Sequence, residues 1–208
     1  MENEMRKIRM TQNLPMVAVI ITAMFTIGLT SCKQTTQDTQ IAAITQSETI
    51  FITENEVLEA QKAWGEGIVK IGKAYLENDD YNAAATDHIN NFYNYQEGTV
   101  LFKPTLASQK QFRTDFKGAF SYFVGGDESY PEDHGFAIKP WSSVRWESIG
   151  IKIIGNIAVA MGNYYFTPFK GGDDVKVEYS FAYTKDKAGK LKIILHDSHL
   201  PYTPIDKH

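Results

Sequence analysis

A histidine and a serine near the carboxyl end of the chain are the residues whose types and spacing best suit chemistry. His196 and Ser198 are two residues apart in an alternating segment, so a β-strand would direct both side chains to one face. An imidazole beside a hydroxyl can form a nucleophilic pair. The sequence has no G-x-S-x-G turn, however, which presents the serine nucleophile of many hydrolases. We therefore interpret the two side chains as the polar lining of a pocket.

The histidines do not predict a metal site. A catalytic zinc ion needs three protein ligands, often histidine or carboxylate, and one open position. His196 and His199 are three residues apart, and this spacing places them on opposite faces of a strand. Cys32 is the single cysteine of the chain, so a cysteine-rich metal site is excluded. We expect no metal, with zinc or manganese as the open alternative.

Helical patterns precede these residues and would have to support them. Thr53 and Glu56 form a capping box, which predicts the start of an amphipathic helix that continues to about residue 76. Further helices are predicted over 81–95 and 108–123, the last with a row of phenylalanines on one side: Phe112, Phe116, Phe120 and Phe123. A short strand is expected over 99–103, and 127–140 resembles an ordered loop.

From Trp141 onward, the hydrophobic period changes to two. Turn residues at 155–156, 171–174 and 186–189 divide this region, which predicts a meander of four antiparallel strands. On the last strand, strict alternation puts Ile194, His196 and Ser198 on one face, and Ile193 and Asp197 on the other. Helices followed by a meander indicate an α+β fold. We expect a curved antiparallel sheet wrapped around the long N-terminal helix, as a cone with His196 and Ser198 in its open mouth.

The N-terminal segment predicts export. Three basic residues precede an uncharged apolar run over 16–28, which ends at Leu29-Thr30-Ser31-Cys32. Such a run is typical of a secretory signal and short for a membrane span, which needs about 20 residues. The sequence before Cys32 fits a lipobox, so we expect a lipoprotein signal peptide over 1–31 and lipid on Cys32. A Thr/Gln-rich tether over 32–50 would follow, and one domain would occupy 51–208.

Charge argues against nucleic acid as a partner. The chain has a net charge of −4, of which residues 1–32 contribute +1, so the remainder carries −5. Phosphate binding usually requires a basic face. Nucleic acid is therefore not an expected partner.

The signal peptide and lipobox indicate the bacterial cell envelope as the expected location, with the lipid on Cys32 as the membrane anchor.

Several segments together resemble the iota-class carbonic anhydrases, which are similar to the association domain of calmodulin-dependent kinase II. The resemblance covers about residues 57–204 and is carried by these segments: AQKAWGEGIVKIGKAY, VLFKPTLASQKQFR, SYFVGGDESYPEDHGFAIKPW, GNIAVAMGNYYFT, VKVEYSFAY and ILHDSHLPYTP. It implies an NTF2-like (SnoaL-like) cone that forms homodimers or larger homo-oligomers. It also implies carbon dioxide and bicarbonate as the substrates, converted in some members without metal.

The resemblance assigns site residues by motif. Thr105, Tyr122 and Ser198 would hold bicarbonate or the attacking water, with His196 as the proton acceptor. The usual terminal motif of the family is His-His-Ser-Ser, whereas this chain has His196-Asp197-Ser198-His199. The substitutions raise an alternative in which the cone binds a small ligand without catalysis, or serves as an oligomeric association module.

Overall fold

The long N-terminal helix begins and ends at the residues that its capping pattern predicts. The structure, a computed structural model, describes residues 51–204. Helix α1 spans Glu54–Glu77. The Thr53 side chain accepts from the Glu56 backbone N–H while the Glu56 carboxylate accepts from the Thr53 backbone N–H, and both bonds satisfy groups that a helix start leaves free. Asn78 ends the helix in the left-handed region, with φ +57°.

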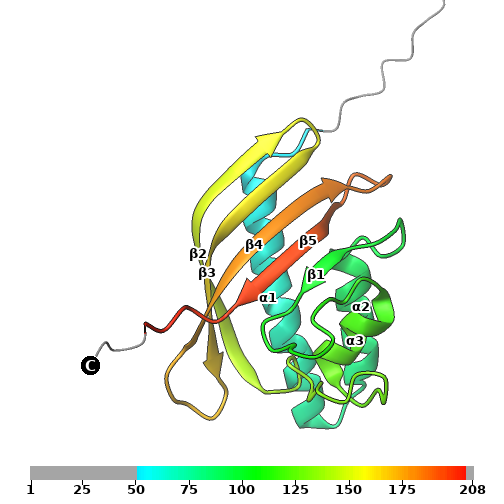
Figure 1. Ribbon diagram of the computed structural model, residues 1–208, viewed down its shortest axis with the longest axis vertical. Coiled ribbons are helices and arrows are strands. Elements are labelled where there is room, and N and C mark those ends of the chain that lie inside the picture. Colours follow the sequence, from blue (N-terminus) through cyan, green and yellow to red (C-terminus); the bar gives the residue numbers. More distant parts are fainter. Residues whose placement is uncertain (1–50, 205–208) are drawn as a thin grey trace, which may run out of the picture. The chain divides into compact units, whose positions relative to one another are not determined.

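Two shorter helices pack beside α1. Helix α2 spans Tyr81–Phe92 and ends three residues before the expected boundary. Helix α3 spans only Phe116–Val124 and is capped by Asp115. The prediction of one helix over 108–123 was therefore wrong, and Phe112 is exposed. In Figure 1, α2 and α3 lie beyond β1 at one edge of the sheet.

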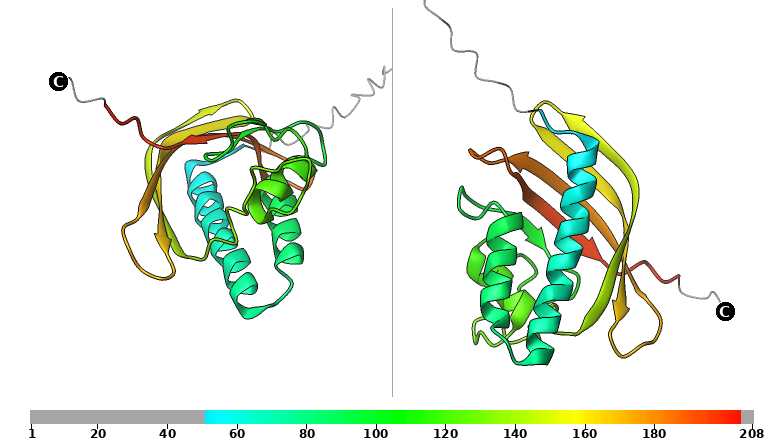
Figure 2. Two further views of the ribbon diagram at one scale, coloured as in Figure 1. Left: turned by 60° about the horizontal axis from the view of Figure 1, so that its bottom comes forward. Right: turned by 180° about the vertical axis from the view of Figure 1, so that it is seen from behind.

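The sheet has five strands in the order β1-β5-β4-β3-β2. Their bounds are Leu101–Lys103, Trp141–Ile154, Ile157–Pro168, Val175–Lys185 and Leu191–His199, for β1 to β5 in turn. The four-strand meander is confirmed. Strand β1 pairs parallel with β5, so the five-stranded sheet is mixed, and the expected antiparallel meander makes up four of its strands. Figure 2 shows the curved sheet around α1.

An irregularity in β5 changes which side chains face the core. Tyr183 pairs with Ile193, whereas the adjacent Ala182 pairs with Leu195, so Ile194 is an extra residue in β5. A bulge of this kind shifts the alternation by one position. Ile193 and His196 are consequently both buried, although strict alternation placed them on opposite faces. His196 and Ser198 do share the inner face as expected, because both follow the bulge.

Aromatic side chains fill the space between α1 and the concave face of the sheet. Trp64 of α1 lies at the centre and packs edge-on against Tyr164, Phe181 and His196. Edge-to-face contacts between rings add to the burial of apolar area. None of the helices within residues 51–204 has the length and apolar character that crossing a membrane requires. The predicted signal peptide, tether and Cys32 lie outside the described residues.

Candidate active site

Two hydroxyl groups that are 93 residues apart in the sequence meet at the end of β5. The Thr105 and Ser198 hydroxyl oxygens are 2.9 Å apart. Parallel pairing of β1 with β5 brings Lys103 opposite Asp197, and Thr105 follows two residues later. The Lys103 ammonium also donates to the Ser198 carbonyl at 3.1 Å. The short strand β1 therefore positions Thr105 against Ser198.

The His196 ring is held between two aromatic rings in the same row of the sheet. Phe102 of β1 and Phe181 of β4 are the register partners of His196 on either side. Their rings stack on the imidazole at centroid distances of 4.7 Å and 4.1 Å. Such a sandwich fixes the plane of the imidazole ring and excludes water from both of its faces.

Both ring nitrogens of His196 have hydroxyl partners. The Tyr93 hydroxyl is 2.9 Å from Nδ1, and the Tyr164 hydroxyl is 3.3 Å from Nε2. Burial lowers the pKa of His196 well below 6.5, and His88 acts in the same direction. The imidazole is therefore neutral near pH 7 and carries a single N–H.

Tyr122 supplies a third hydroxyl group, from helix α3. The side chain is 5% exposed, and its hydroxyl has no hydrogen-bond partner among residues 51–204. Burial raises the pKa of Tyr122, while the Leu106 backbone and the Thr105 hydroxyl lie near enough to oppose that rise. A buried hydroxyl without a protein partner is available to a ligand or to water.

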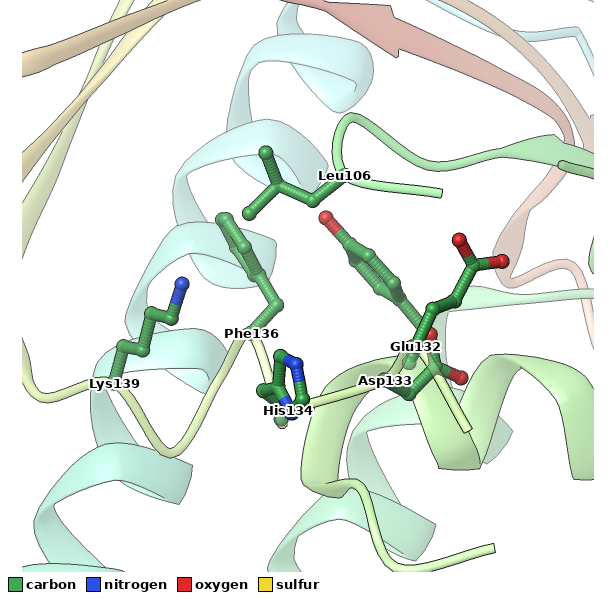
Figure 3. A pocket seen from close by; sticks show the side chains of 8 residues that line it. Leu106, Glu132, Asp133, His134, Phe136 and Lys139 are labelled. Carbon is green, nitrogen blue, oxygen red and sulfur yellow. The ribbon is translucent and has the colours of Figure 1, made fainter. Parts of the chain in front are cut away.

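The pocket beside Tyr122 is small, and one loop supplies most of its lining. It holds about 80 Å³ and is lined by Leu106, Tyr122, Glu132, Asp133, His134, Gly135, Phe136 and Lys139. Figure 3 shows Leu106 and Phe136 on one side of the cavity, with Glu132 and Asp133 across from them. Most of this lining belongs to the segment over 127–140 that the sequence predicts as an ordered loop.

A buried ion pair fastens that loop to the segment before α3, and a serine of α3 donates to the same carboxylate. The Arg113 guanidinium donates to the Asp133 carboxylate at 2.8 Å, and the Ser121 hydroxyl donates to the same carboxylate at 2.7 Å. The Phe136 backbone N–H also donates to the Tyr122 carbonyl at 2.9 Å. Asp133 and Arg113 are both buried, so the loop has a fixed position relative to Tyr122.

Sequence reasoning missed three residues of this cluster as site residues: Trp64, Tyr93 and Tyr164. The Trp64 indole N–H donates to the Tyr93 hydroxyl at 3.1 Å, and the hydroxyls of Ser198 and Thr105 lie near enough to Tyr164 to oppose the rise in pKa that burial causes. Tyr164 was identifiable as an inward residue of a strand. Tyr93 carries no such signal because it follows the end of α2.

The histidines do not converge on a common point. His196 faces inward, whereas His199 is half-exposed and lies 3.1 Å from the Glu178 carboxylate on the other face. His88 is buried among rings with no polar partner within the described part of the chain. No group of three or more His, Cys, Asp or Glu side chains in residues 51–204 is arranged to hold a metal ion.

Comparison with known proteins identifies the family of this chain. A family model described as metal-independent carbonic anhydrase matches residues 55–200. A metal-independent carbonic anhydrase from Nostoc sp. is 48% identical over 154 residues, which cover 73% of this chain and 75% of that protein. The chain belongs to the metal-independent carbonic anhydrase family.

A solved structure agrees with this membership. The crystal structure of a cyanobacterial iota-carbonic anhydrase complexed with bicarbonate matches with a TM-score of 0.72 and 45% identity, over 75% of this chain and 96% of that one. An NTF2-like protein of unknown function from Shewanella oneidensis matches with a TM-score of 0.43 and 12% identity, over 70% and 97% of the two chains. The first of these matches confirms the expected resemblance to the iota-class carbonic anhydrases.

Proposed function

We propose that the chain catalyses the reversible hydration of carbon dioxide to bicarbonate. Family membership supports this activity, and the name of the cyanobacterial relative includes bicarbonate as its ligand. The observation that carries the assignment is the hydroxyl pair of Thr105 and Ser198, 2.9 Å apart. Nearby lies the Tyr122 hydroxyl, which has no hydrogen-bond partner within residues 51–204. Three hydroxyls that converge in a buried setting suit a small triatomic substrate and its planar anionic product.

In the proposed reaction, a water oxygen attacks the carbon of carbon dioxide. A new C–O bond forms, the electron pair of one C=O π bond moves onto its oxygen, and one water proton leaves to solvent or buffer, which yields bicarbonate. Thr105 and Ser198 orient the water, and Tyr122 donates to the oxygen that gains charge. Hydrogen-bond donors that are already in place where charge develops stabilise a transition state.

The proposed mechanism does not use a zinc ion to activate water. Zinc lowers the pKa of bound water to about 7 in other carbonic anhydrases. Hydroxyl groups do not acidify water to that degree, so their contribution is orientation and the exclusion of competing solvent. Fixed geometry of this kind can contribute several kcal/mol of the barrier, on the order of 7 in favourable cases. The short strand β1 and the loop over 127–140 provide that fixed geometry.

Stopped-flow measurement of carbon dioxide hydration by the purified protein tests the proposal. We expect activity after chelation, with no increase on addition of zinc or manganese. Tyr122→Phe and Ser198→Ala should each lower kcat by roughly a hundredfold, the usual cost of a lost donor at developing charge. Tyr183→Phe and Ser180→Ala are matched controls, because Tyr183 is buried elsewhere in the core and Ser180 pairs with Asp197 in the sheet.

Two results would redirect the assignment. Activity that appears only with added metal would move the site to a histidine-ligated ion. Absence of activity under both conditions would favour the binding or association module. Isothermal titration with bicarbonate would then separate a ligand-binding cone from a module that only assembles.

We further propose that the chain is exported and anchored in the cell envelope by lipid on Cys32. The support is the uncharged run over 16–28 followed by the lipobox-like Leu29-Thr30-Ser31. Cys32→Ser should abolish incorporation of labelled palmitate and shift the protein from the membrane fraction to the soluble fraction. Incorporation of label into the Cys32→Ser protein would contradict the anchor.

The outer face of the sheet supports a homodimer as the assembled form. Apolar side chains on β2 and β3 are exposed there: Ile149, Ile154, Val159 and Met161. Exposed apolar patches of this kind commonly mark protein–protein contacts. Light scattering should therefore give twice the chain mass for the protein, and the chain mass itself for an Ile149→Lys, Met161→Lys variant. A monomeric wild type would overturn the proposal.

A further inference from the structure

Four buried groups form a hydrogen-bonded series that ends at the candidate site. It runs from the Trp64 indole to the Tyr93 hydroxyl at 3.1 Å, from Tyr93 to His196 Nδ1 at 2.9 Å, and from His196 Nε2 to the Tyr164 hydroxyl at 3.3 Å. Each of the four side chains is at most 2% exposed. The donor at each step can be worked out from the chemistry of the groups.

The direction of the series starts from the indole. An indole N–H can only donate, so the Tyr93 oxygen accepts from Trp64. Tyr93 has one hydrogen of its own, and within the described residues His196 Nδ1 is its one acceptor. A proton on Nδ1 would leave that hydrogen without an acceptor in a dry core, which is costly. Tyr93 therefore donates to Nδ1.

The backbone around Tyr93 makes this donation well oriented. The Tyr93 N–H donates to the Ile89 carbonyl at 2.8 Å, and the Asn94 N–H donates to the Ile193 carbonyl at 3.0 Å. Tyr93 also forms a bridge with Ile193, next to the bulge that turns His196 inward. The same short segment thus fixes both partners of the hydrogen bond.

We infer that Tyr93 is a positioning residue that holds His196 in its Nε2–H tautomer, and that His196 thereby directs the Tyr164 hydroxyl into the reaction as a further catalytic donor. This inference rests on the proposed carbon dioxide hydration. Because Nε2–H donates to the Tyr164 oxygen, the Tyr164 hydrogen stays free to point toward Thr105, Ser198 and a bound substrate oxygen. Tyr164 and Tyr122 would then both donate to the oxygen that gains charge.

This role differs from the one expected from the sequence, in which His196 accepts the proton of water. In the Nε2–H tautomer, the free lone pair is on Nδ1, where Tyr93 already occupies it. The nitrogen that faces Tyr164 carries a hydrogen and cannot take another. His196 accordingly acts by orienting Tyr164, and the proton of water must leave by solvent or buffer.

Nitrogen NMR of the full chain labelled at the histidine rings tests the tautomer without reference to activity. The wild type should show His196 with its hydrogen on Nε2. In Tyr93→Phe, that preference should be lost, and kcat should fall by about tenfold with little change in KM, less than the loss of a direct donor. Tyr164→Phe should keep the Nε2–H tautomer yet lose roughly a hundredfold in kcat. Tyr183→Phe, another buried tyrosine, should match the wild type in both measurements.

The outcomes separate the inference from the function on which it rests. A wild-type His196 with its hydrogen on Nδ1 would overturn the inference, whatever the activity of the variants. Full activity in Tyr164→Phe would remove Tyr164 from the reaction. A wild type that has the Nε2–H tautomer but does not hydrate carbon dioxide would refute the proposed function and support the hydrogen-bond order. The wild-type spectrum decides the tautomer even if Tyr93→Phe fails to fold.

Discussion

Asp197 and His199, where the chain departs from the terminal motif that the resemblance implied, lie on the outer face of β5. Their side chains are 42% and 50% exposed, and His199 lies near Glu178 of the neighbouring strand. His196 and Ser198 alternate with them and face inward. The two departures are therefore separated from the hydroxyl cluster by the sheet itself.

We expect the double variant Asp197→Asn, His199→Ser to hydrate carbon dioxide at the wild-type rate, within roughly twofold, because surface changes of this kind cost little. Stopped-flow assay of both proteins at equal concentration measures the ratio. A loss comparable to that of Ser198→Ala would mean that the outer face takes part in the reaction.

For single residues, the sequence predicted the shared face of His196 and Ser198 because side chains alternate regularly along β5 after the bulge at Ile194. It misassigned Ile193, because the bulge at Ile194 leaves no mark in the composition. It also missed Tyr93, whose role depends on a partner 103 residues away. A contact between residues so far apart in the sequence cannot be predicted from the spacing of neighbouring residues.

One carboxylate fastens the segment before α3 to the loop over 127–140. Glu132 accepts from the backbone N–H groups of Ser108, Gln109 and Lys110 at 2.8 to 3.1 Å. The phenylalanine spacing over 112–123 favours a helix locally, but Glu132 comes from a loop that the sequence does not connect to this segment. Helix α1, in contrast, was predictable because its cap uses only neighbours.

Replacing Glu132 by Gln should lower the free energy of unfolding by about 2 kcal/mol, the usual contribution of charge-assisted hydrogen bonds. Urea denaturation measures the change, with the exposed Glu128→Gln on the same loop as the matched control. An unchanged midpoint for Glu132→Gln would show that the segment holds its conformation without the carboxylate.

Glu132 should also make the stability of the folded state depend on pH in acid. Hydrogen bonds from the backbone, foremost that of Gln109, lower the pKa of Glu132 from 4.5 to about 2. A lowered carboxyl pKa stabilises the folded state above the unfolded value and ceases to do so as pH falls through the folded one. The contribution of Glu132 should therefore disappear between about pH 4.5 and 2.

At the scale of the whole domain, two buried histidines within residues 51–204 oppose folding in acid. Burial lowers the pKa of His88 from 6.5 to about 3 and that of His196 in the same direction. The unfolded chain then binds more protons than the folded one below pH 6.5, so stability falls with pH by up to about 1.4 kcal/mol per unit for each group.

We expect the urea midpoint of the wild type to fall steeply from pH 7 to pH 5, and that of His88→Leu to fall less. His88→Leu removes the charge change and keeps an apolar side chain of similar bulk against Gly67, above which the imidazole packs closely. The exposed His134→Gln is the comparison for loss of a histidine at the surface. Equal slopes for His88→Leu and the wild type would contradict the role of His88.

The parallel pairing of β1 with β5 has a consequence for when the protein can act. Thr105 precedes the four-strand meander, whereas Ser198 lies in its last strand, and the two meet only when that strand pairs with β1. Contacts of such long range form late, after the cost of closing the intervening loop has been met. A nascent or C-terminally clipped chain would therefore contain most of the fold and none of the assembled site, so the appearance of activity reports completion of the last strand.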